Sequence, residues 1–246
     1  FILGGHMIVL FTDFGLPYTG QMRSALRQAG WRGDIISLFD DAPSFDPKAS
    51  AYLLATYADD FPDNAVFVCV IDPGVGSDRA PVALKAGAQW FVGPDNGLFE
   101  VLIRRRDATA WRLTWQPDRL SNSFHGRDLF APVAAKLALG VDPATLAEPH
   151  APLRMEAWPD DLAEIIYIDG LGNAMTGLRA DSLSKDAEIK VAGQQLSLAE
   201  TFSNREPGQA FWYKNANGLV EISVNLGRAD QELGLKPGNS LKILNK

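Results

Sequence analysis

Ala65-Val66-Phe67-Val68-Cys69-Val70-Ile71 is the strongest strand signal in the chain, and Asp72-Pro73-Gly74-Val75-Gly76 follows it directly. A short run that is apolar at every position is typical of a strand buried on both faces, as in a parallel sheet. The glycines behind it permit a tight turn with close backbone approach to a ligand. We therefore expect a buried parallel strand that delivers a carboxylate to one edge of its sheet.

The segments around this strand alternate between strand and helix patterns. Apolar runs predict strands at residues 7–11, 35–39 and 90–92, and helical spacing predicts helices at 21–29, 47–57 and 130–139. Strands that alternate with helices imply right-handed crossovers and a mostly parallel sheet. The first part of the chain is thus predicted to be an α/β domain with helices flanking the sheet.

The pattern changes after the Pro-rich stretch at residues 149–159. Short strands with alternating apolar and polar residues are predicted at 188–191, 210–213, 219–224 and 241–244. They favour a small antiparallel barrel or sandwich. We expect an N-terminal domain at residues 7–155 and a C-terminal domain at 156–246. Residues 1–6 are interpreted as a cloning remnant before a native start at Met7.

Composition limits the class of protein. The 246 residues are 46% hydrophobic and 22% charged, with a net charge of −7. An acidic surface argues against a nucleic-acid-binding protein, which needs a basic face. No apolar run approaches the ~18 residues that a membrane span requires. The single cysteine, Cys69, excludes an internal disulfide framework and fits a reducing cytoplasm.

Few side chains are available as soft metal ligands. Apart from His6, the chain contains only His125, His150 and Cys69 as candidates. This set is too small for a typical zinc site. A magnesium or calcium site made of carboxylates remains open, but we expect no metal.

Acidic side chains follow four of the predicted strands. They are Asp13, the pair Asp40-Asp41, Asp72 and Asp95. Open parallel sheets bind ligands at the carboxyl ends of their strands. Each aspartate alone is equally compatible with a turn or a helix cap. Together they predict a site for a ligand that is cationic, rich in hydroxyl groups, or both.

A second polar segment, Ser121-Asn122-Ser123-Phe124-His125-Gly126-Arg127-Asp128, precedes the helix predicted at 130–139. His125 lies among polar and charged residues rather than on an apolar helical face. Loop histidines often have a purely structural role, but a pKa near neutrality also suits proton transfer. The residues alone leave both roles open.

Five motifs occur in an order and spacing that resembles a known family. They are Thr12-Asp13-Phe14-Gly15, Asp72-Pro73-Gly74-Val75-Gly76 with Arg79, Pro94-Asp95-Asn96-Gly97, Phe124-His125-Gly126-Arg127-Asp128 and Ile168-Asp169-Gly170-Leu171-Gly172-Asn173. Together they resemble the S-adenosyl-L-methionine hydroxide adenosyltransferases, relatives of the fluorinase and chlorinase enzymes. The resemblance runs from Met7 almost to the C-terminus.

The resemblance implies an enzyme that hydrolyses S-adenosyl-L-methionine to adenosine and L-methionine without a metal or an organic cofactor. It also implies an α/β domain followed by a small β-barrel. The family forms homotrimers, in which the substrate lies between the N-terminal domain of one subunit and the C-terminal domain of the next.

The family's functional residues fall on matching positions of this chain. The triad that holds the attacking water falls on Asp72, Arg79 and His125. The residues that the resemblance assigns to substrate binding are Asp13 (ribose hydroxyls), Phe45 (ribose cover), Asp169 (methionine amino group), Asn173 (adenine), Tyr18, Asn96 and Gly126. Arg79 is expected to favour hydroxide over water, and His125 could take the proton with Asp72 orienting the histidine or the arginine, but which of the three ends with the proton stays open.

Several alternatives remain. Halogenating relatives carry Tyr-Ser in place of His125-Gly126 and lack the triad, so water is favoured over halide. The acidic residue that the family has before Tyr18 is missing here, and Ala216 replaces a serine, so a non-catalytic sensor of adenosine or S-adenosyl-L-methionine stays open. A calcium-dependent nucleoside hydrolase would need a denser group of acidic residues around Asp72.

Overall fold

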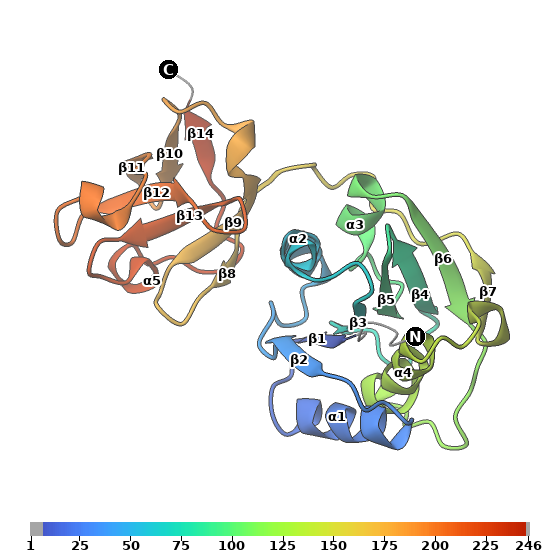
Figure 1. Cartoon of the computed structure of the whole chain (residues 1–246). Helices are drawn as coiled ribbons and strands as arrows, with labels where there is room; N and C mark the ends of the chain where they lie inside the picture. The colour runs from blue at the N-terminus through green and yellow to red at the C-terminus, as the bar shows by residue number, and fades with distance from the viewer. Residues whose placement is uncertain (1–6, 245–246) are drawn as a thin grey trace. The chain divides into compact units, whose positions relative to one another are not determined.

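The computed structural model describes residues 7–244 of the chain (Figure 1). The chain divides into two compact units between Met155 and Glu156. The first unit combines helices and strands, and the second consists mainly of strands, which confirms the predicted fold class. The predicted cloning remnant at residues 1–6 lies outside the described residues.

A seven-stranded sheet in the order β2-β1-β3-β5-β4-β6-β7 forms the centre of the first unit. Its strands are β1 (Ile8–Thr12), β2 (Ile35–Phe39), β3 (Val66–Val70), β4 (Pro81–Ala86), β5 (Gln89–Pro94), β6 (Ala108–Leu113) and β7 (Ala147–His150). The first four strands in this order are parallel, as predicted. β4, β6 and β7 add antiparallel pairs, so the whole sheet is mixed.

Helices cover both faces of this sheet (Figure 1). On one face, α1 (Tyr18–Gln28) and α4 (Ala131–Ala138) share a core with β1 and β3. On the other face lie α2 (Pro47–Tyr57) and α3 (Glu100–Arg105). Every side chain of β3 is buried between these layers, including the free thiol of Cys69. This position explains why its sequence is apolar throughout.

Two helices illustrate how local sequence sets their ends. The bounds of α2 are those predicted, because the Asp46 side chain accepts a hydrogen bond from Ala49 N and Pro47 occupies the first turn. The helix predicted at 130–139 differs, because a π-helical turn at Gly126–Phe130 precedes α4. Pro132 has no N–H to continue an α-helical ladder, which favours a change of hydrogen-bond register there.

The second unit contains two antiparallel sheets, in the orders β11-β10-β14 and β12-β13-β9-β8. Its elements are β8 (Leu162–Ile168), β9 (Ala174–Arg179), β10 (Glu188–Val191), β11 (Gln194–Ser197), β12 (Ala210–Lys214), β13 (Leu219–Val224), α5 (Ala229–Glu232) and β14 (Lys242–Leu244). Isolated bridges join the sheets at Glu164–Ser240 and Leu198–Trp212. The strands therefore surround one apolar core as a barrel-like ring with two weakly paired seams.

Strand β13 also buries two polar side chains, Glu221 and Ser223, which alternate with core residues. The Tyr213 hydroxyl and Asn215 Nδ2 both donate hydrogen bonds to the Glu221 carboxylate. Burial raises the pKa of Glu221, and the nearby Asp169 carboxylate raises it further. Ser223 Oγ donates to Asn173 Oδ1 over 2.7 Å. A buried polar row thus connects β13 with the loop that follows β8.

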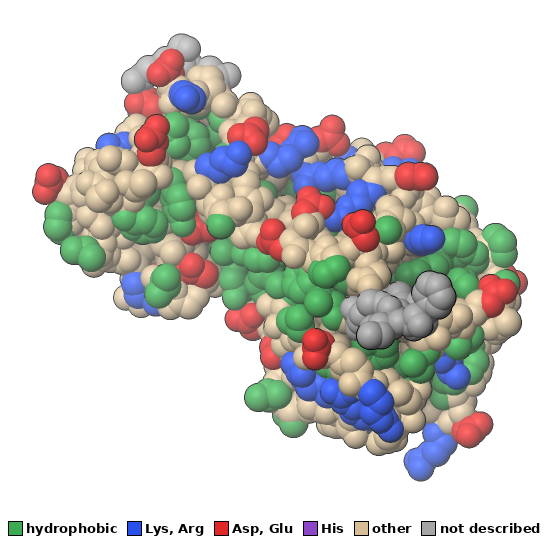
Figure 2. Space-filling view, viewed as in Figure 1, with side chains coloured by type: hydrophobic (Ala, Val, Ile, Leu, Met, Phe, Trp, Pro, Cys, Tyr) green, Lys and Arg blue, Asp and Glu red, His purple; other side chains and the backbone are tan. Residues whose placement is uncertain are grey.

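Figure 2 shows Lys and Arg side chains gathered over α1. The arginines of this segment are Arg23, Arg27 and Arg32, and each donates to backbone carbonyl groups nearby. Their guanidinium groups therefore support the local structure around α1. Among the described residues, no helix has both the length and the apolar character needed to cross a membrane.

Candidate functional site

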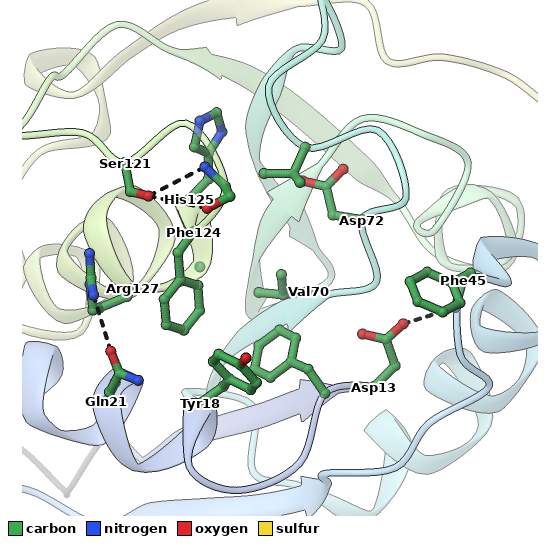
Figure 3. A pocket seen from close by; sticks show the side chains of 14 residues that line it. Asp13, Tyr18, Gln21, Phe45, Val70, Asp72, Ser121, Phe124, His125 and Arg127 are labelled. Carbon is green, nitrogen blue, oxygen red and sulfur yellow. Dashed lines mark hydrogen bonds between the residues drawn. The ribbon is translucent and has the colours of Figure 1, made fainter.

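A pocket of about 570 Å³ opens at the carboxyl ends of β1 and β3 (Figure 3). Its walls come from the loops that follow β1, β2 and β3, and from the segment that leads into the π-helical turn. The residues predicted for the site that line it are Asp13, Tyr18, Phe45, Asp72, His125 and Gly126. Segments far apart in the sequence therefore converge on one cavity, at the sheet edge where the acidic side chains were expected.

Asp13 and Phe45 form one side of this pocket. Phe45 N donates to Asp13 Oδ2 over 2.9 Å. Phe45 has a positive φ of 57°, and 77% of its surface is exposed. A bulky residue in this conformation is strained, and such strain is concentrated at functional sites. Burial raises the pKa of Asp13, although the hydrogen bond from Phe45 opposes this rise.

Asp72, Arg79 and His125 form a continuous chain of hydrogen bonds. Arg79 Nε donates to both carboxylate oxygens of Asp72, at 3.1 and 3.0 Å, and Arg79 Nη2 lies 2.9 Å from His125 Nδ1. A guanidinium group can only donate, so Nδ1 must accept. The neutral imidazole consequently carries its proton on Nε2.

The surroundings of His125 favour this neutral form. Burial lowers its pKa, and the positive charge of Arg79 lowers it further, whereas Asp72 and Asp128 act in the opposite direction. The side chains of Asp72 and Arg79 are only 4% and 9% exposed, so water screens their charges weakly. The predicted residues Asp72, Arg79 and His125 are therefore contiguous: Asp72 and His125 line the pocket, and Arg79 lies behind them with little contact to water.

Close packing between two loops keeps the hydrogen-bonded side chains Asp72, Arg79 and His125 together. Gly76 has a φ of +81°, and a Cβ atom placed there would lie 2.8 Å from the backbone oxygen of Asn122. The loop that carries Asp72 and Arg79 therefore lies directly against the segment that carries His125. Only glycine fits this position without strain.

Asp128 organises the histidine segment from its other side. It accepts a hydrogen bond from Ser121 N over 2.9 Å and pairs with Arg127. Arg127 also donates to Gln21 Oε1 over 3.0 Å, as Figure 3 shows. Gln21 and Arg127 both line the pocket, but neither was predicted for substrate binding. For Arg127, the sequence signal that could have predicted a place in the pocket was its position, with Asp128, directly after His125-Gly126.

Aromatic rings form the apolar part of the pocket. Phe14, Tyr18 and Phe124 meet edge to face, with ring centroids 5.6 to 5.8 Å apart. Gly126 packs behind them, and a Cβ atom there would lie 3.3 Å from the Phe124 ring. The predicted residues Tyr18 and Gly126 thus shape the cavity.

Asn96 and Asp95 make contacts elsewhere in the same unit. Asn96 Nδ2 donates to the carbonyl of Ile71 over 2.8 Å, directly before Asp72 in the chain. Asp95 accepts from Leu153 N and is hydrogen-bonded to His150 Nε2. The structure therefore gives Asn96 a contact that holds the end of β3 rather than a place in the pocket wall.

Asp169 and Asn173 belong to the second unit, in the loop between β8 and β9. Asp169 Oδ1 accepts from Leu171 N and Asn173 N at 2.9 and 2.8 Å, and Oδ2 accepts from Asn173 Nδ2 at 3.0 Å. The side chains of Asp169 and Asn173, both predicted to bind substrate, are therefore hydrogen-bonded to each other. Within residues 7–244, no group of three or more His, Cys, Asp and Glu side chains is arranged to hold a metal ion.

Comparison with known proteins gives two family matches. Residues 8–147 match the SAM hydroxide adenosyltransferase N-terminal domain, and residues 163–242 match the corresponding C-terminal domain.

Similar curated proteins carry one name. An (R)-S-adenosyl-L-methionine hydrolase from Salinispora arenicola is 36% identical, over 94% of this chain and 95% of that protein. A protein of the same name from Thermus thermophilus is 32% identical, over 96% of this chain and 99% of that protein. Among solved structures, an uncharacterized conserved protein from Thermotoga maritima has a TM-score of 0.88 at 27% identity, covering 97% of this chain and 100% of that one.

Proposed function

The chain belongs to the SAM hydroxide adenosyltransferase family, and on that premise we propose that it hydrolyses S-adenosyl-L-methionine to adenosine and L-methionine. The family expected from the five sequence motifs is thereby confirmed. The observation that carries the proposal is the hydrogen-bonded chain Asp72–Arg79–His125 beside a pocket that also holds Asp13.

The proposed reaction is a displacement at the 5′ carbon of the ribose. The oxygen of water forms a bond to this carbon while the carbon–sulfur bond breaks and its electron pair passes to sulfur. The leaving group is a neutral thioether, so it needs no proton from a general acid. The attacking water loses one proton to the surrounding solvent, so the products are adenosine, L-methionine and H⁺. The demanding part is therefore to position and activate that water.

The triad suits this task. The guanidinium of Arg79 lies behind His125 and does not line the pocket, so its positive charge, which water screens weakly, would act on a bound hydroxide through the imidazole. His125 accepts from Arg79 through Nδ1, so its Nε2–H is a donor that can hold the nucleophilic oxygen. Of the roles that the sequence left open for His125, this arrangement favours a hydrogen-bond donor to hydroxide over a proton acceptor. Asp72 orients Arg79 through both carboxylate oxygens.

Substrate binding is assigned to the remaining pocket residues. A carboxylate such as Asp13 can accept from both hydroxyls of a cis-diol, which suits ribose. The exposed ring of Phe45 lies beside it and offers a surface to cover the sugar. Tyr18 and Gly126 shape the apolar wall. Asn96 supports Asp72 by holding the carbonyl of Ile71.

For the second unit we propose contacts with both ends of the substrate. Asn173 would bind adenine and Asp169 the amino group of methionine, as the family resemblance implies. On the same basis we propose a homotrimer in which these residues join the pocket of a neighbouring subunit. The exposed side chain of Leu171, between them in the loop, supports an interface at this loop.

Two further features are proposed. The names of the relatives specify the R form of S-adenosyl-L-methionine, and we propose the same preference here. The fully buried, free thiol of Cys69 suits the cytoplasm as the site of action.

The experiment that tests the function is incubation with S-adenosyl-L-methionine in H₂¹⁸O, followed by chromatography and mass spectrometry. We expect adenosine that carries ¹⁸O in its 5′ hydroxyl group, and little adenosine from His125→Ala. Release of free adenine would instead indicate cleavage of the glycosidic bond. Formation of 5′-chloroadenosine when chloride is added would indicate a halogenase, and binding without a product would indicate a sensor.

A further inference from the structure

Asn173 has limited freedom to turn its amide group. Its side chain lies in a largely buried site, 6% exposed, between Asp169 and Ser223. Asp169 Oδ2 accepts from Asn173 Nδ2 over 3.0 Å, and Ser223 Oγ donates to Asn173 Oδ1 over 2.7 Å. One end of the amide is therefore bound to an acceptor and the other to a donor.

The carboxylate of Asp169 decides which way the amide faces. An ionised carboxylate can only accept, so turning the amide by 180° would bring two oxygens together. Asp169 Oδ1 is itself held by the backbone N–H groups of Leu171 and Asn173. Ser223 is fully buried, so water cannot replace its hydroxyl group. Asp169 thus sets the orientation of the amide, and Ser223, which donates to the amide oxygen in this orientation, holds its other end in place.

Asn173 therefore keeps one amide hydrogen and one lone pair of its amide oxygen for a ligand. A fixed donor and acceptor on one amide complement adenine, which offers an amino group beside a ring nitrogen that accepts. Hypoxanthine carries a carbonyl oxygen in place of that amino group. A fixed amide therefore meets hypoxanthine with its oxygen facing another oxygen.

We propose that Asp169 and Ser223 are positioning residues that fix the amide of Asn173 in one orientation, and that this orientation selects an adenine ring over its 6-oxo counterpart. The inference rests on the proposed function, in which Asn173 binds the base. It gives Asp169 a role in base recognition in addition to any contact with the methionine amino group.

Asp169→Asn gives the sharpest test, because the structure dictates how the new amide must lie. Its oxygen is required by the N–H groups of Leu171 and Asn173, so its NH₂ group must face Asn173. Asn173 then turns its own oxygen towards residue 169 and its NH₂ group towards Ser223, whose hydroxyl can also accept. The substitution is therefore expected to reverse the amide without removing a hydrogen bond.

The measurement is the ratio of the dissociation constants of inosine and adenosine, obtained by calorimetry on the 246-residue chain. Neither ligand has an amino-acid end, so any contact of Asp169 with methionine does not enter. We expect the wild type to prefer adenosine by roughly five- to a hundredfold. We expect Asp169→Asn to lose or invert that preference, and Ser223→Ala to reduce it by about threefold or more.

Thr176→Val is the matched control for loss of a buried hydroxyl in the same unit. Thr176 Oγ1 is also buried and donates to a backbone carbonyl, that of Val220, over 2.8 Å. The Thr176→Val substitution should lower the free energy of unfolding and leave the ratio of the inosine and adenosine dissociation constants unchanged. Ser223→Thr, which keeps a hydroxyl, should restore the ratio.

An unchanged ratio in folded Asp169→Asn and Ser223→Ala would overturn the inference, as would equal affinity of the wild type for adenosine and inosine. The proposed function fails separately, if the wild type releases no adenosine from S-adenosyl-L-methionine. Because the ratio is measured without turnover, the two failures are distinguishable.

Discussion

Arg79 Nη2 lies 2.9 Å from His125 Nδ1 and donates a hydrogen bond to it. This contact fixes the tautomer of the imidazole, because the guanidinium offers only N–H groups. It also couples His125 to Asp72, which accepts from Nε and from the same Nη2 of this guanidinium. The three side chains therefore act as one unit, and removing the central member should affect both ends.

Arg79→Lys should lower kcat for S-adenosyl-L-methionine hydrolysis by about 10²–10³, because one ammonium group cannot reproduce the planar fork of donors. Steady-state kinetics, with adenosine followed by chromatography, measure the effect. Arg119→Lys, at an exposed position outside the pocket, is the matched control and should retain full activity. A kcat within about threefold of the wild type would remove Arg79 from the mechanism.

The neutral tautomer of His125 can be observed directly. Its pKa is lowered by burial and by Arg79, so we expect an NMR titration midpoint below the ordinary value of about 6.5 and a proton on Nε2 at neutral pH. Protonation would add a hydrogen on Nδ1, facing Arg79, and should reduce activity on the acid side. A midpoint above 6.5, or an Nδ1–H tautomer, would contradict this geometry. His125→Asn identifies the resonance.

The same shift has a consequence for stability. The folded protein binds a proton at His125 less readily than the unfolded chain does, because its folded pKa is the lower one. The contribution to stability is therefore present above the unfolded pKa of about 6.5 and is lost as the pH falls through the folded value. Chemical denaturation from pH 8 to pH 5 should show a smaller decline for His125→Asn than for the wild type.

Gly76→Ala should loosen the contact between the two loops that carry the triad. The positive φ of +81° and the 2.8 Å approach to Asn122 O both oppose a side chain there. We expect a loss of about 1–3 kcal/mol in stability and a lower kcat. Gly140→Ala is the control, since Gly140 has a φ of +82° but no atom within 4 Å of its added Cβ. Equal activity in the two variants would mean that the loop contact does not position the triad.

Asp13→Asn should raise KM, because an amide accepts from both ribose hydroxyls less well than a carboxylate does. An increase of roughly ten- to a hundredfold is expected from hydrogen bonds to a charged group. The sharper readout uses the 2′-deoxy analogue of the substrate. The wild type should lose affinity for this analogue relative to the parent compound, whereas Asp13→Asn should lose little. Parallel losses in both proteins would show that Asp13 does not contact that hydroxyl group.

The sequence predicted the elements whose signals are local. β2, α2, β10 and β13 have their predicted bounds, because apolar runs and a capped first turn identify them without tertiary information. β4 and β6 were not predicted. β4 begins with Pro81 and contains Lys85, and β6 carries the exposed polar residues Thr109 and Arg112, because these strands lie towards the antiparallel side of the sheet. Their apolar pattern is accordingly weak.

The features of the candidate site also separate into those that the sequence predicts and those that only the structure shows. Asp13 and Asp72 were expected at one edge because both follow parallel strands. The direction of the hydrogen bond from Arg79 to His125 was not predictable, since it depends on contact between loops 46 residues apart in sequence. The motif that contains Asn96 predicted that this residue binds the substrate. In the structure its Nδ2 donates a hydrogen bond to the carbonyl of Ile71. Motif spacing predicted these residues, and only their three-dimensional contacts show which of them line the pocket.

The reactivity of Cys69 reports whether each variant keeps its fold. This residue is the only cysteine in the chain, it is fully buried on β3, and burial raises the pKa of its thiol well above the ordinary value. A thiol reagent can therefore modify the native protein only when the central strand opens to solvent. The labelling rate of each variant thus reports the opening of the layer that carries Asp72, without an added probe. A variant that loses activity but labels as slowly as the wild type has lost chemistry rather than its fold.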